Sequence, residues 1–227
     1  MANDVEVRYE SSGQEIKLNP AIVRNYLTNG NEDVSQQEVM MFISLCKYQQ
    51  LNPFLKEAYL VKFKGAPAQI ITSKEAYMKR AFNSKNFDGI EAGIIVLRDS
   101  AIVELEGSFK LDSDKLLGGW AKVYVKDKKV PYTSKISIEE FSKGQSTWKS
   151  MPATMIRKTA MVQALREAFP ETLGGLYIAE EQGVDETNSS IDLTKNSEII
   201  EANFTEEVEN ITGNENGEND TVIDPEF

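Results

Sequence analysis

The stretch that decides the fold runs from Gly144 to Tyr177 and reads GQSTWKSMPATMIRKTAMVQALREAFPETLGGLY. Its larger apolar side chains recur at helical intervals, so that they fall along one side of an α-helix. The residues of this stripe are Met151, Met155, Val162, Leu165 and Phe169. We therefore expect a helix whose apolar stripe faces the core of the protein.

Residues with strong positional preferences mark both ends of this helix. Ser150 can serve as the N-cap, and Pro152 suits the first turn, where its missing N–H donor costs nothing. Pro170 cannot continue a helix, and Gly174 and Gly175 favour an exit turn. The sequence thus predicts a helix that begins after Ser150 and stops before Pro170.

Three cations accompany the apolar stripe. Lys158 falls inside it, where a lysine must extend its amine to the surface, pair with a carboxylate or reach an anionic ligand. Arg157 lies about 100° from Lys158 around the helix, and Arg166 lies about 80° away on the other side. The pattern fits a helix that presents cations to a ligand, and it also fits an ordinary core helix with solvated basic edges.

Composition excludes several kinds of chemistry. The chain has 227 residues, 41% of them hydrophobic, which is enough for one substantial domain with a normal core. It contains no histidine, which removes imidazole catalysis, the usual nucleophilic triads and histidine-containing zinc sites. The single cysteine, Cys46, allows no internal disulfide and fits a reducing compartment. No apolar run approaches the roughly 20 residues of a membrane span, and no secretory pattern is present, so we expect a cytoplasmic protein without membrane contact.

The net charge of −11 is distributed unevenly along the chain. Residues 181–227 hold 14 acidic residues and one basic residue, a net charge of −13, whereas residues 1–180 carry +2. Residues 110–166 alone carry +7. A partly basic folded region followed by an acidic tail suggests a polyanionic partner. The tail is poor in apolar residues, so we expect it to be disordered. We expect it to compete with a polyanion for the basic region, and the alternatives are a tail that recruits a protein partner or one that only keeps the protein in solution.

Hydrophobic periodicity and turn residues predict an α+β protein. The expected order is two helices, a β-hairpin, a helix, a strand meander and the long helix, which places a small antiparallel sheet and the hairpin on helices. Asn19 is predicted to cap the first helix, and capping boxes are predicted for Ser35 with Glu38 and for Thr72 with Glu75. The expected helices cover residues 19–28, 35–51, 72–82 and 137–143, and the expected strands cover 59–63, 68–72, 90–97, 101–109, 119–125 and 130–136.

No recognised phosphate-binding loop is present, because GxxxxGK[ST] and GxGxxG are both missing from the sequence. An ATP-driven recombinase or helicase is therefore not expected. Asp112, Asp114 and Lys115 form the best nuclease-like group, because paired carboxylates near a lysine can hold magnesium for phosphodiester cleavage. That spacing is common by chance, so a metal-dependent nuclease is kept only as an alternative.

With these kinds of catalysis set aside, the sequence favours a binding surface made of cations and aromatic side chains. Single-stranded nucleic acid is held by cationic grooves that follow the phosphates, with aromatic groups near the bases. Strand aromatics are, however, more often core residues than stacking platforms. The aromatic candidates are Tyr59, Tyr124, Tyr132 and Trp148, and the cations include Lys56, Lys62, Lys64, Lys74, Lys79, Arg80, Lys122, Lys126, Lys128, Lys129, Lys149, Arg157, Lys158 and Arg166.

Four blocks in the chain resemble the Redβ/RecT family of bacteriophage single-strand annealing proteins, often called recombination protein Bet. The blocks are LNPFLKEAYLVKF, PAQIITSKEAYMKRA, GGWAKVYVKD and the segment from Trp148 to Pro170 that contains MIRKTAMVQALREAFP. They occur in the family's order and cover roughly residues 16–181. We accordingly expect a flexible N-terminus over 1–15, in which residues 1–13 are disordered or form a loose strand, an annealing core over 16–181 and an acidic tail over 182–227.

The resemblance implies ATP-independent binding of single-stranded DNA and annealing of complementary strands in phage recombination. It implies no cofactor, no metal and no covalent chemistry, so the protein is not expected to be an enzyme. The implied partners are single-stranded DNA, the annealed duplex, further copies of the chain in a ring or helical filament, a phage 5′–3′ exonuclease and the host single-strand binding protein. The implied location is the bacterial host cytoplasm.

The resemblance also implies a basic DNA groove that runs through neighbouring subunits. Some relatives carry cations where this chain has Ala153 and Thr154, so Lys149 or Lys158 would substitute there. The expected DNA-binding residues are Lys62, Lys74, Lys79, Lys122, Lys149, Arg157, Lys158 and Arg166. A passive protein that protects single strands without annealing them is the main alternative, and a protein-only scaffold is a further one.

Overall fold

The computed structural model describes residues 6–30, 32–142, 146–182 and 184. The N-terminal segment, expected to be flexible or a loose strand, contains strands β1 (Val7–Ser11) and β2 (Gln14–Leu18), which pair antiparallel. The Tyr9 hydroxyl donates to the Leu51 carbonyl at 2.6 Å, and the Ser11 hydroxyl donates to the Gln50 carbonyl at 2.7 Å. These bonds fasten the first strand to the loop that follows the second helix.

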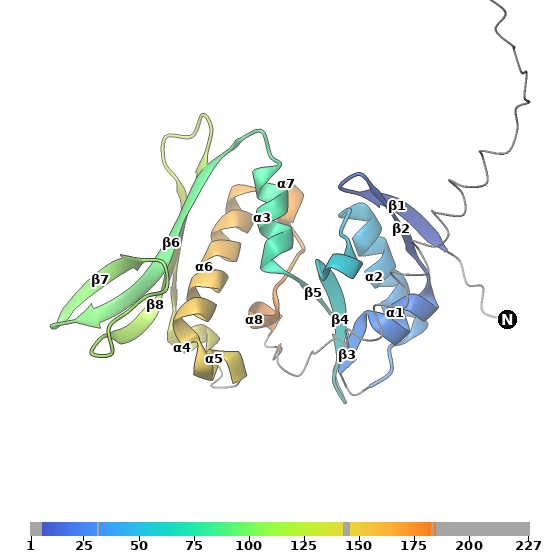
Figure 1. The fold of residues 1–227 in the computed structure, drawn as a ribbon, viewed down its shortest axis with the longest axis horizontal. Helices are drawn as coiled ribbons and strands as arrows, with labels where there is room; N and C mark the ends of the chain where they lie inside the picture. Colours follow the sequence, from blue (N-terminus) through green and yellow to red (C-terminus); the bar gives the residue numbers. More distant parts are fainter. Residues whose placement is uncertain (1–5, 31, 143–145, 183, 185–227) are drawn as a thin grey trace, which may run out of the picture. The chain divides into compact units, whose positions relative to one another are not determined.

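Two capped helices follow the hairpin (Figure 1). Helix α1 (Pro20–Tyr26) starts at Asn19, whose side chain accepts from the Ile22 amide at 2.8 Å. Helix α2 (Gln36–Tyr48) has the predicted capping box, in which Ser35 and Glu38 each accept from the other's backbone amide. Both predicted N-termini are confirmed because each depends on a local bond that a few adjacent residues determine.

A three-stranded sheet contains the predicted hairpin and one strand that was not predicted. Strands β4 (Ala58–Lys62) and β5 (Gln69–Thr72) pair antiparallel, whereas β3 (Thr28–Gly30) pairs parallel with β4. A short 3₁₀ helix, η1 (Pro53–Leu55), leads into β4. Strand β3 has only three residues, too few to show a strand period, so the sequence could not reveal it.

Helix α3 (Lys74–Phe82) follows β5 directly. Its N-cap is Ser73, whose hydroxyl accepts from the Ala76 amide at 3.2 Å. The predicted cap at Thr72 is therefore wrong by one residue, because Thr72 remains in the strand and its amide donates to the Tyr177 carbonyl at 2.8 Å.

The predicted meander forms a four-stranded antiparallel sheet with the order β7-β6-β8-β9. Arg98 and Ala101 are paired across a two-residue turn in which Asp99 and Ser100 both have positive φ, the conformation that matches strand twist. The strands are β6 (Phe87–Arg98), β7 (Ala101–Glu106), β8 (Lys115–Val125) and β9 (Tyr132–Ser137).

The long helix predicted from the opening stretch is α6 (Pro152–Ala168), which packs on one face of this sheet (Figure 1). Pro152 stands in the first turn as expected, but the N-cap is Met151, and no side chain caps this end. Ser150 instead ends a preceding short helix, so its predicted role as the cap is wrong. The other short helices are α4 (Ile138–Phe141), α5 (Ser146–Ser150), α7 (Pro170–Leu173) and α8 (Ala179–Gln182).

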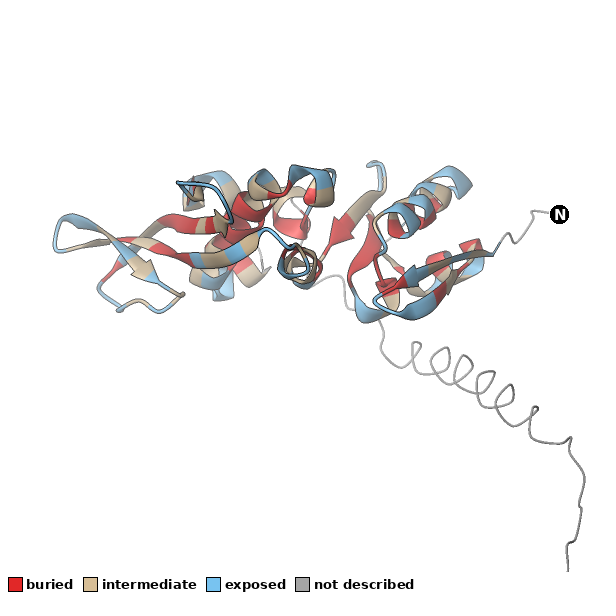
Figure 2. Ribbon diagram, turned by 90° about the horizontal axis from the view of Figure 1, so that it is seen from above, coloured by how far each residue is buried: buried red, intermediate tan, exposed pale blue. Residues whose placement is uncertain are grey.

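The main core lies between the sheets and helices, where Figure 2 shows the buried residues. Of the predicted stripe, Met155, Val162, Leu165 and Phe169 are buried, whereas Met151 is 50% exposed. Cys46 is fully buried in the same core, as expected of a small apolar residue. The α+β class and the small antiparallel sheet are therefore confirmed.

The acidic tail over 182–227 was expected to be disordered. Only residues 182 and 184 of this range belong to the described part of the chain, and the remainder lies outside it. Among the described helices, none is both long and apolar enough to cross a membrane.

Close contact between α6 and β8 depends on Gly119. A Cβ added there would lie 2.6 Å from the Ile156 carbonyl oxygen and 2.9 Å from its carbon. Since both atoms are backbone atoms of the helix, the neighbour cannot move aside as a flexible side chain could.

We predict that Gly119→Ala lowers the free energy of unfolding by about 1–3 kcal/mol, because the helix must shift away from the sheet. Urea unfolding followed by circular dichroism measures this change. Thr133→Ala serves as the control, because Thr133 is exposed on the neighbouring strand β9. Equal unfolding midpoints for Gly119→Ala and the wild-type protein would contradict the prediction.

Candidate nucleic-acid interface

Arg166 is held by partners from several elements. Its Nη1 donates to the Leu176 carbonyl at 3.0 Å and to a Glu181 carboxylate oxygen at 2.9 Å, while Nη2 donates to the other oxygen of that carboxylate. The guanidinium also lies 5.0 Å from the centre of the Tyr177 ring, and Nη1 is 3.5 Å from the Tyr77 hydroxyl. The ion pair raises the pKa of Arg166, so the side chain stays charged. Arg166 thus has a structural role, whatever contact it makes with a ligand.

The structure shows which of the three expected roles Lys158 has in the apolar stripe. Its amine pairs with the Glu180 carboxylate at 2.8 Å, and the Glu180 side chain is almost completely buried. Of the three outcomes open to a lysine in this stripe, the structure therefore shows the ion pair. Helix α8 supplies Glu180 and Glu181, so two adjacent carboxylates face two of the predicted DNA-binding cations.

Arg157 lies on a different side of α6 and makes a different kind of contact. Its Nε donates to the Ala92 carbonyl of β6 at 3.1 Å. Within the described residues no ion pair joins Arg157 to a carboxylate. A guanidinium has five N–H donors, so this one bond leaves most of its donors available for a phosphate.

The predicted cations of the hairpin and α3 also have acidic neighbours. Lys62 pairs with Glu38 at 2.9 Å, and Lys79 pairs with the buried carboxylate of Glu57 at 2.5 Å. Lys74 lies 3.4 Å from Glu75, which is largely exposed, and such surface pairs contribute little to stability. Lys62 and Lys79 therefore have structural partners, whereas Lys74 remains close to solvent.

Glu38 joins three segments through its two carboxylate oxygens. One oxygen accepts from Lys62 and from the Ser35 amide, and the other accepts from the Ala68 amide at 2.9 Å. These donors, above all the Lys62 amine, lower the pKa of Glu38 to about 2. The carboxylate therefore links the start of α2 to β4 and to the turn before β5.

Lys122 lies on the sheet face that α6 does not cover. Gly119 faces α6, and alternation along β8 turns residues 120, 122 and 124 the other way. The Lys122 amine lies 5.3 Å from the centre of the Trp120 ring, close enough for a cation–π contact. Among the described elements, none packs over this outer face (Figure 1). The face is mixed in charge, because Glu91 and Glu104 also point to it by their register with Lys122 and Ile95.

The last predicted residue, Lys149, is exposed on the short helix α5. Lys62, Lys79, Lys158 and Arg166 are in ion pairs with poorly exposed carboxylates. Lys122, Lys149 and Arg157 lie on three different elements, β8, α5 and α6, and have no such pair among the described residues. A groove through neighbouring subunits stays a prediction.

The proposed nuclease-like group has a structural explanation. Both carboxylate oxygens of Asp114 accept from Arg98, at 2.7 and 2.6 Å, and one also accepts from the Leu111 amide. The Arg98 guanidinium is the main reason that the pKa of Asp114 falls to about 2. Asp112 is exposed, and the described residues contain no cluster of three potential metal ligands. Asp114 fastens the loop before β8 to the end of β6.

The predicted aromatic residues are mostly structural. Tyr59 and Trp148 are buried, and the Tyr124 hydroxyl donates to Glu91 at 3.1 Å. Trp120, which the aromatic list lacked, is 7% exposed and donates from its ring N–H to the Leu105 carbonyl at 3.2 Å. These rings support the sheet more than they offer faces to DNA bases.

One group of exposed cations was only partly identified from sequence. Lys126, Lys128 and Lys129 occupy the β8–β9 turn, and Lys85 reaches the same region from the connection between α3 and β6. The Lys126 amide donates to the Asn86 carbonyl at 2.8 Å, which brings the two segments together. The turn lysines were visible in the sequence as candidates, but Lys85 lies about 40 residues earlier and needed the fold to place it.

Comparison with known protein families identifies the family of this chain. A model described as the RecT family matches residues 13–193 of the chain. The chain belongs to the RecT family. Membership implies DNA binding and single-strand annealing in phage recombination, so the family resemblance seen in the sequence is confirmed. A search of curated proteins finds no match.

RecT family proteins are annealing proteins and not classical enzymes, which agrees with the coarse function expected from sequence. The match covers every described element from β2 to α8, whereas β1 precedes it. The individual contacts with DNA remain predictions.

We predict that Glu38→Gln makes stability less dependent on pH in acid. A carboxylate whose folded pKa is lowered from 4.5 to about 2 stabilises the protein above the higher value, and this stabilisation is lost as the pH falls between the two. Urea midpoints measured from pH 5 to pH 2 should therefore decline less steeply in the variant. Glu140→Gln, at an exposed position of α4, is the matched control and should follow the wild-type curve.

We also predict that two arginines of α6 behave oppositely. Arg166→Ala should lower the free energy of unfolding by about 2–4 kcal/mol, because it leaves Glu181 without its main partner. Arg157→Ala should cost less than about 1 kcal/mol, yet weaken binding to single-stranded DNA and reduce the salt slope by about 0.7. Unfolding curves and fluorescence anisotropy at several salt concentrations give both quantities. An unchanged salt slope for folded Arg157→Ala would remove Arg157 from the interface.

Proposed function

We propose that the chain binds single-stranded DNA and anneals complementary strands without ATP, in phage homologous recombination. The observation that carries this proposal is the RecT family match over residues 13–193. The lack of either phosphate-binding motif in the full sequence supports independence from ATP.

The proposed mechanism works by position and charge. Cations hold the phosphates of one strand and leave its base edges exposed, so that a second strand meets an ordered template and loses less entropy on pairing. Of the eight predicted residues, Lys74, Lys122, Lys149 and Arg157 fit this role best, because they do not share an ion pair with a buried carboxylate. Lys62, Lys79, Lys158 and Arg166 would act mainly by shaping the surface that carries the others.

Assembly and partners belong to the same proposal. We infer a ring or filament in which the separate cationic surfaces of adjacent copies line one path for DNA, since many weak contacts on one strand add up to strong binding. A phage 5′–3′ exonuclease would supply the single strands. The host single-strand binding protein would be the competitor or partner on that DNA.

The deciding experiment mixes two complementary oligonucleotides, one carrying a fluorophore and the other a quencher, with and without the protein. We expect faster quenching with the full chain in buffer that contains EDTA and no nucleotide. Gel analysis of the same samples should show intact strands. Dependence on ATP, or shortening of the labelled strand when magnesium is added, would contradict the proposal.

A further inference from the structure

The β8–β9 turn and the α3–β6 connection together carry four lysines, which we call the lysine tip: Lys85, Lys126, Lys128 and Lys129. All four are exposed. No hydrogen bond or ion pair to a carboxylate is found for any of them among the described residues. Most of the predicted DNA-binding cations, by contrast, have an acidic neighbour.

Backbone hydrogen bonds hold the lysine tip together. The Lys126 amide donates to the Asn86 carbonyl at 2.8 Å, and the Lys128 amide closes the turn on the Val125 carbonyl at 3.1 Å. The Phe87 amide donates to the Ser84 carbonyl at 3.1 Å, which closes the other segment. Phe87 and Val125 are also paired across β6 and β8. The two lysine-bearing segments are therefore fixed against each other by the sheet.

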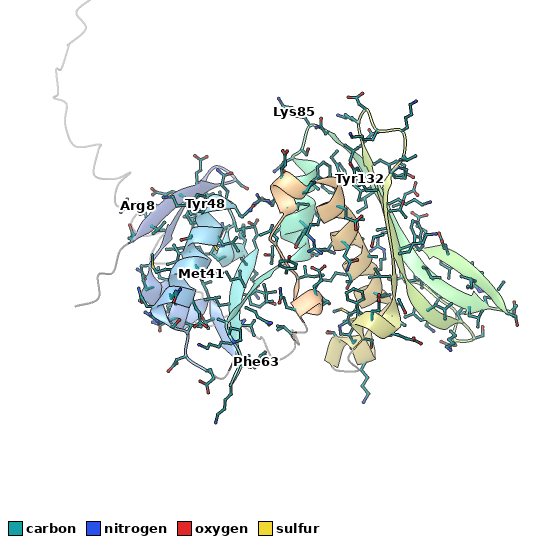
Figure 3. All side chains as sticks on the ribbon, turned by 180° about the vertical axis from the view of Figure 1, so that it is seen from behind. Arg8, Met41, Tyr48, Phe63, Lys85 and Tyr132 are labelled. Atoms are coloured by element: carbon teal, nitrogen blue, oxygen red, sulfur yellow. The ribbon has the colours of Figure 1, made fainter. Side chains whose placement is uncertain are left out.

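The charge of this region is concentrated. Lys126 and Lys129 are three positions apart, so at most about 11 Å of chain separates their Cα atoms, a distance comparable to the Debye length at 0.1 M salt. The two segments hold one acidic residue, Asp127, and Asp88 follows at the start of β6, so these six charged residues together carry +2. Figure 3 shows Lys85 beside the part of the structure that carries Tyr132, the first residue of β9.

Neither lysine-bearing segment, 83–86 or 126–131, contains an aromatic residue, and the neighbouring Phe82 packs against Phe87 with 4.8 Å between the ring centroids. Val130 is 73% exposed. Solvated lysines act as point charges without a fixed fork, so they attract phosphates in many orientations. Such a surface is better suited to the first contact with a mobile strand than to holding a strand in a fixed register for base pairing.

We propose that the lysine tip captures the incoming complementary strand through its phosphates and thereby speeds annealing. This inference rests on the proposed annealing function. Clustered cations raise the local concentration of a polyanion and its rate of association, and salt weakens this effect steeply. The first strand is held elsewhere, by the cations that include Arg157 and Lys149. The lysine tip therefore affects the rate at which the complementary strand associates more than it affects the affinity for the first strand.

The test removes the charge without changing the fold. Two variants are needed: Lys128→Gln with Lys129→Gln, and the fourfold change that adds Lys85→Gln and Lys126→Gln. Lys47→Gln with Lys115→Gln is the charge-matched control for the double variant, because both residues are exposed and lie on α2 and at the start of β8. Urea unfolding midpoints confirm that all variants fold.

Two quantities are compared in each variant, at 50 mM and at 200 mM salt. One is the affinity for a first oligonucleotide by anisotropy, and the other is the rate of annealing after the complementary strand is added. For the fourfold variant we expect the rate at 50 mM to fall about fivefold, with a smaller difference at 200 mM and an affinity within about twofold of the wild-type value. The double variant should show an intermediate loss, and the control should anneal at the wild-type rate.

The possible outcomes separate this inference from the proposed function. If the wild-type protein does not accelerate annealing at all, the proposed function fails. If it does and the fourfold variant anneals equally fast, only the role of the lysine tip is refuted. A parallel loss of affinity and rate would place the tip in the first strand's site and would also overturn the inference. Tip variants that anneal normally but no longer bind polyglutamate would assign it to an acidic protein segment instead.

Discussion

The guanidinium of Arg166 is the contact on which the arrangement of the surrounding elements depends. A charged group that is mostly out of water needs a full set of hydrogen-bond partners, and those of Arg166 come from α8, from the segment before it and from Tyr77 of α3. The same C-terminal segment also contacts β5, because the Tyr177 carbonyl accepts a hydrogen bond from the Thr72 amide. Arg166, with the neighbouring pair of Lys158 and Glu180, thus fixes the position of the last described helix against the helix that covers the four-stranded sheet.

The basic residues thus fall into two groups, those that pair with poorly exposed carboxylates and those that do not. Lys62, Lys79 and Lys158 share ion pairs in which at least one partner is poorly exposed, so a phosphate could take them only by displacing a carboxylate from its site. The other group is solvated or bound to backbone and is ready to meet an anion. The net positive charge of a segment therefore does not show where DNA binds, because carboxylates of the same protein neutralise some of its cations.

Local features of the sequence predicted more of the fold than of the site. The caps at Asn19 and Ser35 and the hairpin at residues 59–72 were correct because neighbouring residues determine them. The cap at Ser150 was wrong because the short helix α5 ends at that residue, and the cap at Thr72 was wrong because Thr72 stays in β5, paired with Ala58. The carboxylate partners of Lys158 and Arg166 lie 22 and 15 residues away in α8, at the border of the acidic tail. No periodicity could have joined residues across that distance, and the same is true of Lys85 and the β8–β9 turn.

Strand β7 forms one border of the four-stranded sheet, and β6 is its only strand partner among the described residues. A border of this kind exposes unpaired amide and carbonyl groups to which a strand from another molecule could add, and growth of this type leads to aggregates. Strand β7 carries Glu104 and Glu106 at alternating positions, and both are exposed. The like charges would oppose a second acidic β7 laid alongside, so this edge is protected against uncontrolled sheet growth.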